Sequence, residues 1–299
     1  KGCYPLTLAV INEDTGEIMA TLLAKVLEEK PGFLGSFSRH STIRGGPIFV
    51  DNKYGIEAVS LLLQHYNKTV AKDVLYSRIY PLNDTPQVIP CFKENGYEYE
   101  YWRNFLIDLT KSKEDLWRSL AHDKRKAVRK AKKNGLQVCE CADKGEIPFF
   151  YDLVKERYIK RKTPLEDVSN FEAVFDILVP KNEAKFFFVK YKEEYIATRL
   201  VLLYKGLIYA WYSGSNSAYL RYHPNDLITW HVLEWGSENG FHTFDFGGGG
   251  ELHEANAGWV EFKRRFGSKP INYGRYTKVH KPKKLWLAEK AFALYKRVL

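Results

Sequence analysis

The alternation of apolar and polar residues predicts a similar order of elements in the two halves of the chain. Each half has an apolar strand after a turn, then a second strand, an amphipathic helix and a final strand. The first strand, the helix and the last strand lie at 18–23, 56–65 and 74–80 in one half, and at 196–203, 226–238 and 241–246 in the other. The sequence therefore predicts an α/β (α+β) protein with two similar domains on mixed sheets, the alternative being a chance similarity of short patterns.

A basic helix is predicted between the two halves. Ser112 begins a segment with the spacing of a capping box, and Gly135 ends it. Outside one apolar stripe the helix is densely cationic, and Arg125, Arg129 and Lys133 are candidates for binding nucleic acid. A merely solvated charged face is the alternative reading. The expected division is residues 1–110, the helix at 111–135, and residues 136–299.

Composition and charge narrow the class of protein. Of the 299 residues, 45% are hydrophobic and 15% aromatic, which excludes a disordered chain, and the apolar runs are too short to cross a bilayer. The net charge of +10 favours anionic partners such as nucleic acid, nucleotide-linked substrates or a membrane surface. The chain begins at Lys1 without an initiator Met or a signal-peptide pattern, so we expect a trimmed, cytoplasmic protein.

The cysteines and histidines predict no metal site. The four cysteines lack paired Cys-x-x-Cys spacing, and we expect them to be reduced structural thiols. The eight histidines show neither metal spacing nor the spacing of a nucleophile with its base. We therefore expect no metal and no tightly bound cofactor. The cysteines are Cys3, Cys91, Cys139 and Cys141.

Two neighbouring segments near the C-terminus are the main candidates for chemistry. The first, FDFGGGG, places Asp245 before Gly247, and its glycines allow the backbone to pass close beside a groove. The second, FKRRFG, places Lys263 between the bulky side chains of Phe262 and Phe266. A partly desolvated ammonium there can act on an oxyanion or a phosphate, whereas the alternative is a lysine that extends to solvent over an apolar patch.

A strand upstream of the glycine run supplies further candidates. Arg199 lies in the apolar strand 196–203, where an unpaired guanidinium is costly, so it is either functional or paired with a buried carboxylate. On the next strand Tyr209 and Trp211 share one face. They either form the floor of a groove or pack in the core.

These motifs together resemble a known family. Asp-Phe-Gly-Gly followed by Phe-Lys-x-x-Phe-Gly is similar to the C-terminal signature of the FemABX family of peptidyltransferases and of its relatives in the wider GNAT superfamily. Residues 222–230 and 238–240 resemble the family's penultimate helix, residues 117–135 its basic interdomain helix, and Arg44-Gly45-Gly46-Pro47 its first-domain loop. The resemblance implies a tandem pair of GNAT-like domains that transfers an acyl group to an amine.

The resemblance also implies substrates and site residues. The donor would be an aminoacyl-tRNA, or an acyl-CoA as in most GNAT enzymes, and the acceptor an amine on a nucleotide- or lipid-linked cell-envelope precursor, with peripheral membrane contact. Residues 219–226 lack the glycines of a CoA loop and include Pro224, which disfavours acyl-CoA. A non-catalytic RNA-binding or scaffold protein remains a further alternative. The expected catalytic residues are Lys263, Asp245 and Arg199, and the expected substrate-binding residues are Arg44, Gly45, Gly46, Tyr209, Trp211, Gly247, Gly248, Gly249 and Phe262.

Overall fold

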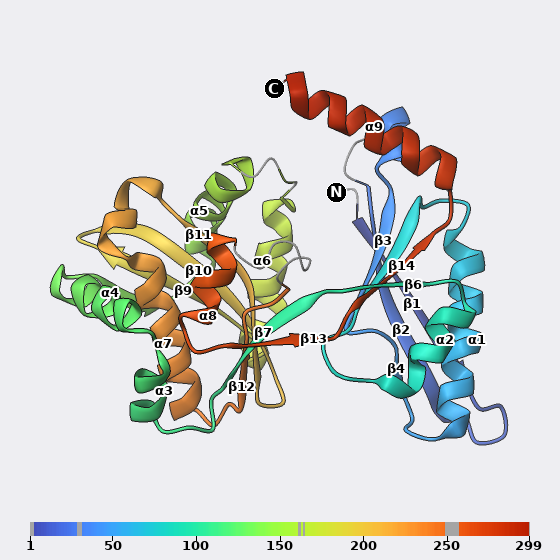
Figure 1. The fold of residues 1–299 in the computed structure, drawn as a ribbon, viewed down its shortest axis with the longest axis horizontal. Coiled ribbons are helices and arrows are strands. Elements are labelled where there is room, and N and C mark those ends of the chain that lie inside the picture. The colour runs from blue at the N-terminus through green and yellow to red at the C-terminus, as the bar shows by residue number, and fades with distance from the viewer. Residues whose placement is uncertain (1–2, 29–31, 161–162, 164, 249–256, 299) are drawn as a thin grey trace. The chain divides into compact units, whose positions relative to one another are not determined.

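A computed structural model describes residues 3–28, 32–160, 163, 165–248 and 257–298 (Figure 1). The chain divides into two compact units, Lys1–Trp102 with Asn272–Leu299, and Arg103–Ile271. Each unit is built on a mixed sheet of seven strands. The predicted α/β fold with two mixed sheets is therefore confirmed.

The first unit packs one long helix on a mixed sheet with the order β1-β2-β3-β5-β14-β6, in which β4 pairs with β2. Among the strand pairs of this unit that the structure describes, β3 and β5 are parallel and the others are antiparallel. Helix α1 begins at the N-cap Asn52, whose side chain accepts a hydrogen bond from the Gly55 amide, and it buries Leu62, Leu63 and Tyr66 in the core. The strands are β1 (Cys3–Ile11), β2 (Ile18–Leu27), β3 (His40–Arg44), β4 (Ile48–Phe49), β5 (Tyr76–Tyr80), β6 (Glu98–Glu100) and β14 (Arg275–Val279); the helices are α1 (Lys53–Val70), α2 (Ile89–Glu94) and α9 (Pro282–Val298).

The second unit has a sheet of order β13-β7-β12-β11-β10-β9-β8 between two sets of helices. Helices α3, α4 and α7 lie on one side of the sheet, and α5 and α6 lie on the other (Figure 1). One hydrophobic core lies between the sheet and the first set, and another between the sheet and the second set. The strands are β7 (Arg103–Asp108), β8 (Gln137–Glu140), β9 (Ala184–Tyr191), β10 (Glu194–Tyr204), β11 (Leu207–Ser215), β12 (Thr243–Asp245) and β13 (Lys269–Asn272). The helices are α3 (Lys113–Ser119), α4 (His122–Lys133), α5 (Ile147–Lys160), α6 (Val168–Ile177), α7 (Pro224–Glu238) and α8 (Gly258–Arg264).

The parallel pair β11 and β12 is short, and this opens one edge of β11. The two strands pair only from Leu207 to Tyr209 on β11 and from Thr243 to Asp245 on β12. Strand β11 continues to Ser215, whereas the chain after Asp245 follows β7, because the Phe246 amide donates to the Phe105 carbonyl. Among the described strands, none pairs with the end of β11 on its β12 side.

The observed division of the chain is not the expected one. Strand β7 lies at 103–108, inside the expected first domain, but belongs to the sheet of the second unit. Strand β14 lies inside the expected second domain, at 275–279, but joins the sheet of the first unit between β5 and β6. Each unit is therefore completed by a strand that the local pattern assigns to the other half.

The basic helix predicted at 111–135 is two helices, α3 and α4, in the second unit. The break falls at Leu120 and Ala121, which have extended backbone torsions. Leu120 is buried in the core, and the Ala121 amide donates to the Arg265 carbonyl at 2.8 Å. The Arg125 guanidinium donates to the carbonyls of Arg118 and Leu120 and so satisfies the end of α3. Burial and these tertiary hydrogen bonds override the helical preference of the segment.

Close packing of α5 on β11 gives a prediction for stability. A Cβ added to Gly214 would lie 2.3 Å from the backbone carbon and oxygen of Leu153. We expect Gly214→Ala to lower the free energy of unfolding by about 1–3 kcal/mol, because a helix backbone cannot withdraw without disturbing the core. Gly258→Ala is the matched control, since nothing lies within 4 Å of its added Cβ. Equal stability of the two variants in denaturant titrations would contradict the packing argument.

Candidate active site

A buried carboxylate fixes the loop that follows β12. Asp245 is 2% exposed at the end of this strand. Its Oδ2 accepts a hydrogen bond of 2.7 Å from Asn104 Nδ2 of β7, and its Oδ1 accepts one of 2.7 Å from the Gly247 amide. Burial raises the pKa of the Asp245 carboxyl, although these hydrogen bonds and the charge of Lys263 act in the opposite direction. Asp245 therefore connects β7, β12 and the glycine loop.

Glycine is required at position 247 for two reasons. Its φ of 75° lies in the left-handed region, and an added Cβ would lie 3.2 Å from Tyr209 Oη and 3.3 Å from the Ala210 carbonyl oxygen. The loop thus passes close beside β11 at the residue where β11 separates from β12. This placement agrees with the close backbone approach expected from the glycine run.

Lys263 is bound to the same loop from the last turn of α8. Its Nζ donates hydrogen bonds to the carbonyl oxygens of Phe246, Gly247 and Gly248 at 3.3, 3.0 and 3.2 Å. The ammonium also lies 5.3 Å from the ring centroids of Phe105 and Trp259, within the range of cation–π attraction. The glycine loop, Asp245, Tyr209 and Lys263 consequently form one site at the open edge of β11.

The expectation that Phe262 and Phe266 enclose the Lys263 ammonium is wrong. Their rings lie instead 4.2 and 5.4 Å from Nζ of Lys124, and 5.0 Å from each other. On a helix, successive residues point about 100° apart, so Phe262 faces away from its neighbour Lys263, whereas Trp259, four residues earlier, lies on the same side. Phe262 therefore contributes to the packing of α4 and α8 in this structure.

This arrangement can stabilise negative charge. A half-buried ammonium among aromatic rings acts through a lower effective dielectric than one in water, and it favours an oxyanion that forms next to it. The three carbonyl acceptors hold the ammonium in place, and an anionic oxygen can replace one of them. An acyl group undergoing attack by an amine generates such an oxygen.

The N-terminus of α7 is occupied by a carboxylate of the chain itself. Asp226 stands in the first turn, is 8% exposed, and its Oδ1 lies 2.7 Å from Nζ of Lys124. Pro224 removes one of the free amides of this turn, and His223 before it has a left-handed φ of 61°. An acidic side chain at this end stabilises the helix. The amide groups that hold a phosphate at other helix N-termini are therefore already next to a negative charge.

The remaining predicted residues have different surroundings. In the first unit, Arg44 is exposed with its guanidinium 5.3 Å from the centroid of the Tyr80 ring, and Gly45 and Gly46 have φ values of 89° and 76°. In the second unit, Trp211 packs against the core beneath α5 and α6. Gly249 lies outside the described residues. Arg199 is buried in β10 and makes no hydrogen bond to the loop residues 246–248 among those described.

The nucleic-acid-binding candidates are not equivalent. Arg125 is half-buried and caps α3, whereas Arg129 and Lys133 are exposed on α4. The Arg129 guanidinium lies 5.4 Å from the Trp117 ring, and no described acidic residue forms an ion pair with Arg129 or Lys133. The exposed cationic face of α4, hereafter the α4 face, consists of Lys126, Arg129, Lys130 and Lys133.

Sequence reasoning missed the residues that β7 and α8 supply to the site. Asn104 and Phe105 lie about 140 positions before the loop, in a short strand without a motif. Trp259 precedes the Phe-Lys motif by only a few residues, and its spacing of four from Lys263 on a helix is a signal that could have found it. Asn104 and Phe105 carry no comparable signal.

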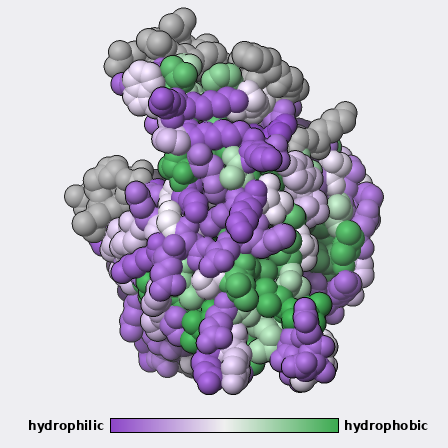
Figure 2. Space-filling view, turned by 90° about the vertical axis from the view of Figure 1, so that its right-hand side faces the viewer, coloured by the Kyte–Doolittle hydropathy of each residue, from purple (hydrophilic) through white to green (hydrophobic). Residues whose placement is uncertain are grey.

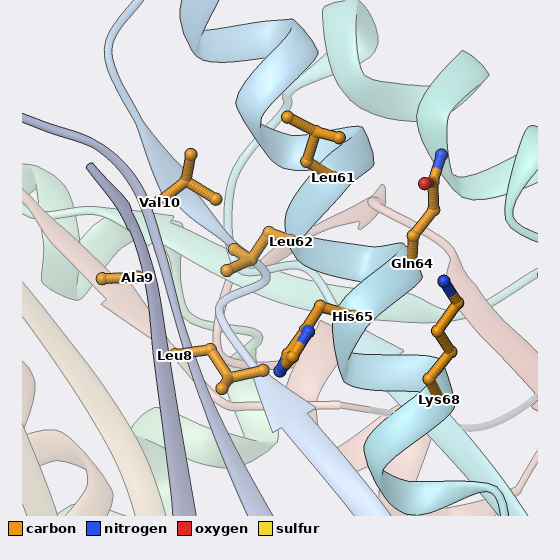
Figure 3. A pocket seen from close by; sticks show the side chains of 8 residues that line it. All are labelled: Leu8, Ala9, Val10, Leu61, Leu62, Gln64, His65 and Lys68. Atoms are coloured by element: carbon orange, nitrogen blue, oxygen red, sulfur yellow. The ribbon is translucent and has the colours of Figure 1, made fainter. Parts of the chain in front are cut away.

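A hollow of about 490 Å³ in the first unit contains none of the predicted site residues. Figure 3 shows Leu8 and Val10 of β1 pointing toward α1, where Leu62 and His65 face them. On the side of the molecule shown in Figure 2, hydrophobic surface gathers among hydrophilic side chains. Exposed large hydrophobic residues of this unit include Ile11, Ile18, Leu23 and Leu61.

Neither a metal cluster nor a membrane span is present in the described part of the chain. No group of three or more His, Cys, Asp or Glu side chains there could hold a metal ion. Across the same residues, every helix is too short or too polar to cross a bilayer. The four cysteines are free thiols.

Comparison with known proteins supports a class for the second unit. Residues 118–264, which include Arg199, Asp245 and Lys263, match the family described as acetyltransferase (GNAT) domain. This match assigns an acyltransferase domain of the GNAT type to that part of the chain, and the tandem fold agrees with it. No curated protein sequence matches the chain.

Solved structures confirm the predicted resemblance to FemABX proteins at the level of the fold. The structure of FemX covers 96% of this chain and 90% of its own, with a TM-score of 0.69 and 18% identity. The structure of L-PGS from Bacillus licheniformis covers 95% and 88%, with a TM-score of 0.58 and 14% identity. A tandem GNAT protein from the clavulanic acid biosynthesis pathway covers 93% and 84%, with a TM-score of 0.55 and 9% identity.

The buried Asp245 carboxylate gives a pH-dependent prediction. Asn104→Ala removes the hydrogen bond to Oδ2, and we expect the free energy of unfolding to fall by about 1–3 kcal/mol at neutral pH. The folded-state pKa is raised above the ordinary value of 3.8, so the folded protein takes up the proton before the unfolded chain does. The loss should therefore shrink as the pH falls toward the raised pKa.

Denaturant titrations of wild type and Asn104→Ala at a series of pH values, from about pH 7.5 down to the lowest pH at which both proteins fold, measure this effect. Asp245→Asn provides the control, because adding Asn104→Ala to it should give a loss that does not change with pH. A loss in the single Asn104→Ala variant that is equal across the whole series would contradict the assignment.

Proposed function

We propose that the protein transfers an aminoacyl group from an aminoacyl-tRNA to an amine of a cell-envelope precursor. The observation that carries this choice of donor is the Lys124–Asp226 pair at the N-terminus of α7. Acyl-CoA enzymes of the GNAT type place the pyrophosphate at the equivalent helix N-terminus, where free amides bind it. Here the Asp226 carboxylate and its partner Lys124 already occupy the start of the helix, and Pro224 has removed an amide.

The α4 face supports a polyanionic donor. Its four cations lie at i, i+3, i+4 and i+7 on one side of a helix whose other side packs on α7. Counterion release from a nucleic acid would give favourable free energy on contact with such a face. A tRNA donor is consistent with the cytoplasmic location that we expect.

Two fold neighbours support the kind of acceptor. FemX covers nearly the whole chain, and another neighbour is the C-terminal domain of a putative lysylphosphatidylglycerol synthetase, a name that combines an amino acid with a lipid. We infer an amine-bearing, nucleotide- or lipid-linked peptide as acceptor. The exposed apolar side chains of the first unit are consistent with peripheral contact to a membrane that contains a lipid-linked acceptor.

The chemistry would take place beside the glycine loop. The acceptor amine attacks the acyl carbonyl, and the carbonyl oxygen becomes an oxyanion. The oxyanion then re-forms the carbonyl as the bond to the tRNA ribose oxygen breaks, and the proton that the amine loses ends on the ribose hydroxyl. In our proposal Lys263 stabilises the oxyanion and Asp245 holds the loop that positions Lys263. The open edge of β11, with Tyr209 at its start, would receive the acyl group.

Acyl-CoA is the second candidate donor, because the matched family is described as acetyltransferase. Incubation of the protein with aminoacyl-tRNA or acetyl-CoA and a mixture of amine acceptors, followed by mass spectrometry, separates the two. We expect an aminoacylated product only in the presence of aminoacyl-tRNA. An acetylated product alone would assign acyl-CoA, and the absence of either product, with tRNA still bound, would favour the non-catalytic RNA-binding protein.

Lys263 should be needed for turnover more than for folding. Lys263→Met retains most of the apolar stem but removes the charge, and we expect the rate of amine acylation to fall about 100-fold or more. Lys263→Arg should restore little activity, because a planar fork cannot reproduce the three short contacts of a compact ammonium. Turnover and thermal melting are measured together.

Lys269→Met, at an exposed position on β13, is the matched control and should keep wild-type turnover. Full activity in folded Lys263→Met would exclude the catalytic role. A lower melting temperature accompanied by unchanged turnover would instead assign Lys263 to loop stability alone.

The α4 face should control the salt dependence of tRNA binding. Changing Arg129 and Lys133 together to Ala should weaken tRNA binding and reduce the slope of log affinity against log salt by about 1.5, because up to two phosphate contacts are lost. We leave Arg125 unchanged in this test because it caps α3.

The control replaces two exposed lysines of the first unit, Lys72 and Lys93, by Ala, which removes the same charge from elsewhere. Binding is measured by filter retention at several salt concentrations. Identical slopes for both double variants would mean that the α4 face has no specific part in tRNA binding.

A further inference from the structure

Arg199 is a buried cation with two nitrogens that have no hydrogen-bond acceptor. The residue lies in β10, between β9 and β11, and is 6% exposed. Its Nε and Nη1 are both shielded from solvent, and neither has a hydrogen-bond partner. The ion pairs of the described residues include none with Arg199. Two of the three nitrogens of this guanidinium are thus desolvated without the compensation that buried polar groups usually have.

A second arginine stands close to the first. Arg157 of α5 donates from Nη1 to the carbonyl oxygen of Ser213 at 3.2 Å and also to the Ser213 hydroxyl. Ser213 is the direct cross-strand partner of Arg199. Burial, together with the positive charge of Arg157, lowers the pKa of Arg199 to about 10, and the guanidinium remains charged at neutral pH.

The charge of half-buried Arg157 next to the buried guanidinium of Arg199 adds to the cost of burying Arg199. An anion with oxygen acceptors removes both costs at once: it accepts from the unpartnered donors and neutralises the repulsion. We infer that Arg199 and Arg157 form an oxyanion-binding site for a carboxylate or phosphate group of a substrate. Arg199 would then be a binding residue, whereas the sequence suggested a catalytic one.

The position in the sheet favours a ligand that also reaches the open edge of β11. Ser213 belongs to the part of β11 beyond its pairing with β12, on the same strand as Tyr209, whose hydroxyl approaches the glycine loop. A carboxylate of a peptide and a phosphate of a nucleotide- or lipid-linked group both provide the negatively charged oxygen acceptors that such a site requires. The inference concerns anion binding and does not depend on the donor proposed above.

Anion-dependent thermal melting without substrates tests the site directly. Inorganic phosphate and acetate serve as probes for the two sources, at constant ionic strength set with sodium chloride. We expect one of them to raise the melting temperature of the second unit by about 5–10 °C at a hundred times its Kd. The response should be absent in Arg199→Met and in Arg157→Met, and partly retained in Arg199→Lys.

Arg118→Met, which removes an exposed arginine of α3, is the matched control and should respond as wild type does. In the absence of either probe, Arg199→Met should melt at the wild-type temperature or above it, because an unpaired buried charge has been replaced by an apolar side chain. A lower melting temperature for Arg199→Met, with a wild-type response to both probes, would assign Arg199 to a structural role and overturn the inference. If neither probe raised the melting temperature of the wild-type protein, the inference would also be overturned.

Discussion

The candidate site depends on one interaction, the burial of the Asp245 carboxylate at the end of β12. A buried carboxylate needs donors, and it takes one from Asn104 and one from the Gly247 amide. The second bond requires the chain to turn within two residues, which glycine permits at a φ of 75°. After this turn the carbonyls of residues 246–248 are all within reach of one donor. Lys263 is that donor, and so the position of α8 follows from the carboxylate on β12.

Local sequence patterns predicted most elements but not their assembly. The apolar run at 196–203 and the periodic segment at 226–238 correspond to β10 and α7, because their patterns reflect burial against a single layer. The local pattern could not predict to which of the two sheets β7 and β14 belong. Each pairs with strands that are 130 or more positions away in the sequence. The sequence of a short strand does not indicate which distant strand it pairs with. The division between the two units therefore differs from the expected one.

In the candidate active site, the sequence predicted the charged residues more accurately than the residues that surround them. Asp245, Gly247 and Lys263 lie together because a strand end and the helix that follows it are close along the chain. The rings around Lys263 were assigned by sequence adjacency, which fails on a helix: the neighbour at i−1 points away, and Trp259 at i−4 lies alongside. Asn104 and Phe105 come from a distant strand. Only the three-dimensional pairing of β7 with β12 reveals them.

In the proposed function, the distribution of positive charge is what separates this chain from a GNAT enzyme that binds a pyrophosphate at its central helix. Lys124 is committed to Asp226 at the start of α7, under the rings of Phe262 and Phe266, where burial makes exchange for a solvent-borne phosphate costly. The four cations of the α4 face lie on the outer side of the helix and have no acidic partners among the described residues. The positive charge of Lys124 at the start of α7 is thus neutralised within the protein. The remaining free charge is spread along a helix, a form that suits the repeating phosphates of a nucleic acid better than a single pyrophosphate.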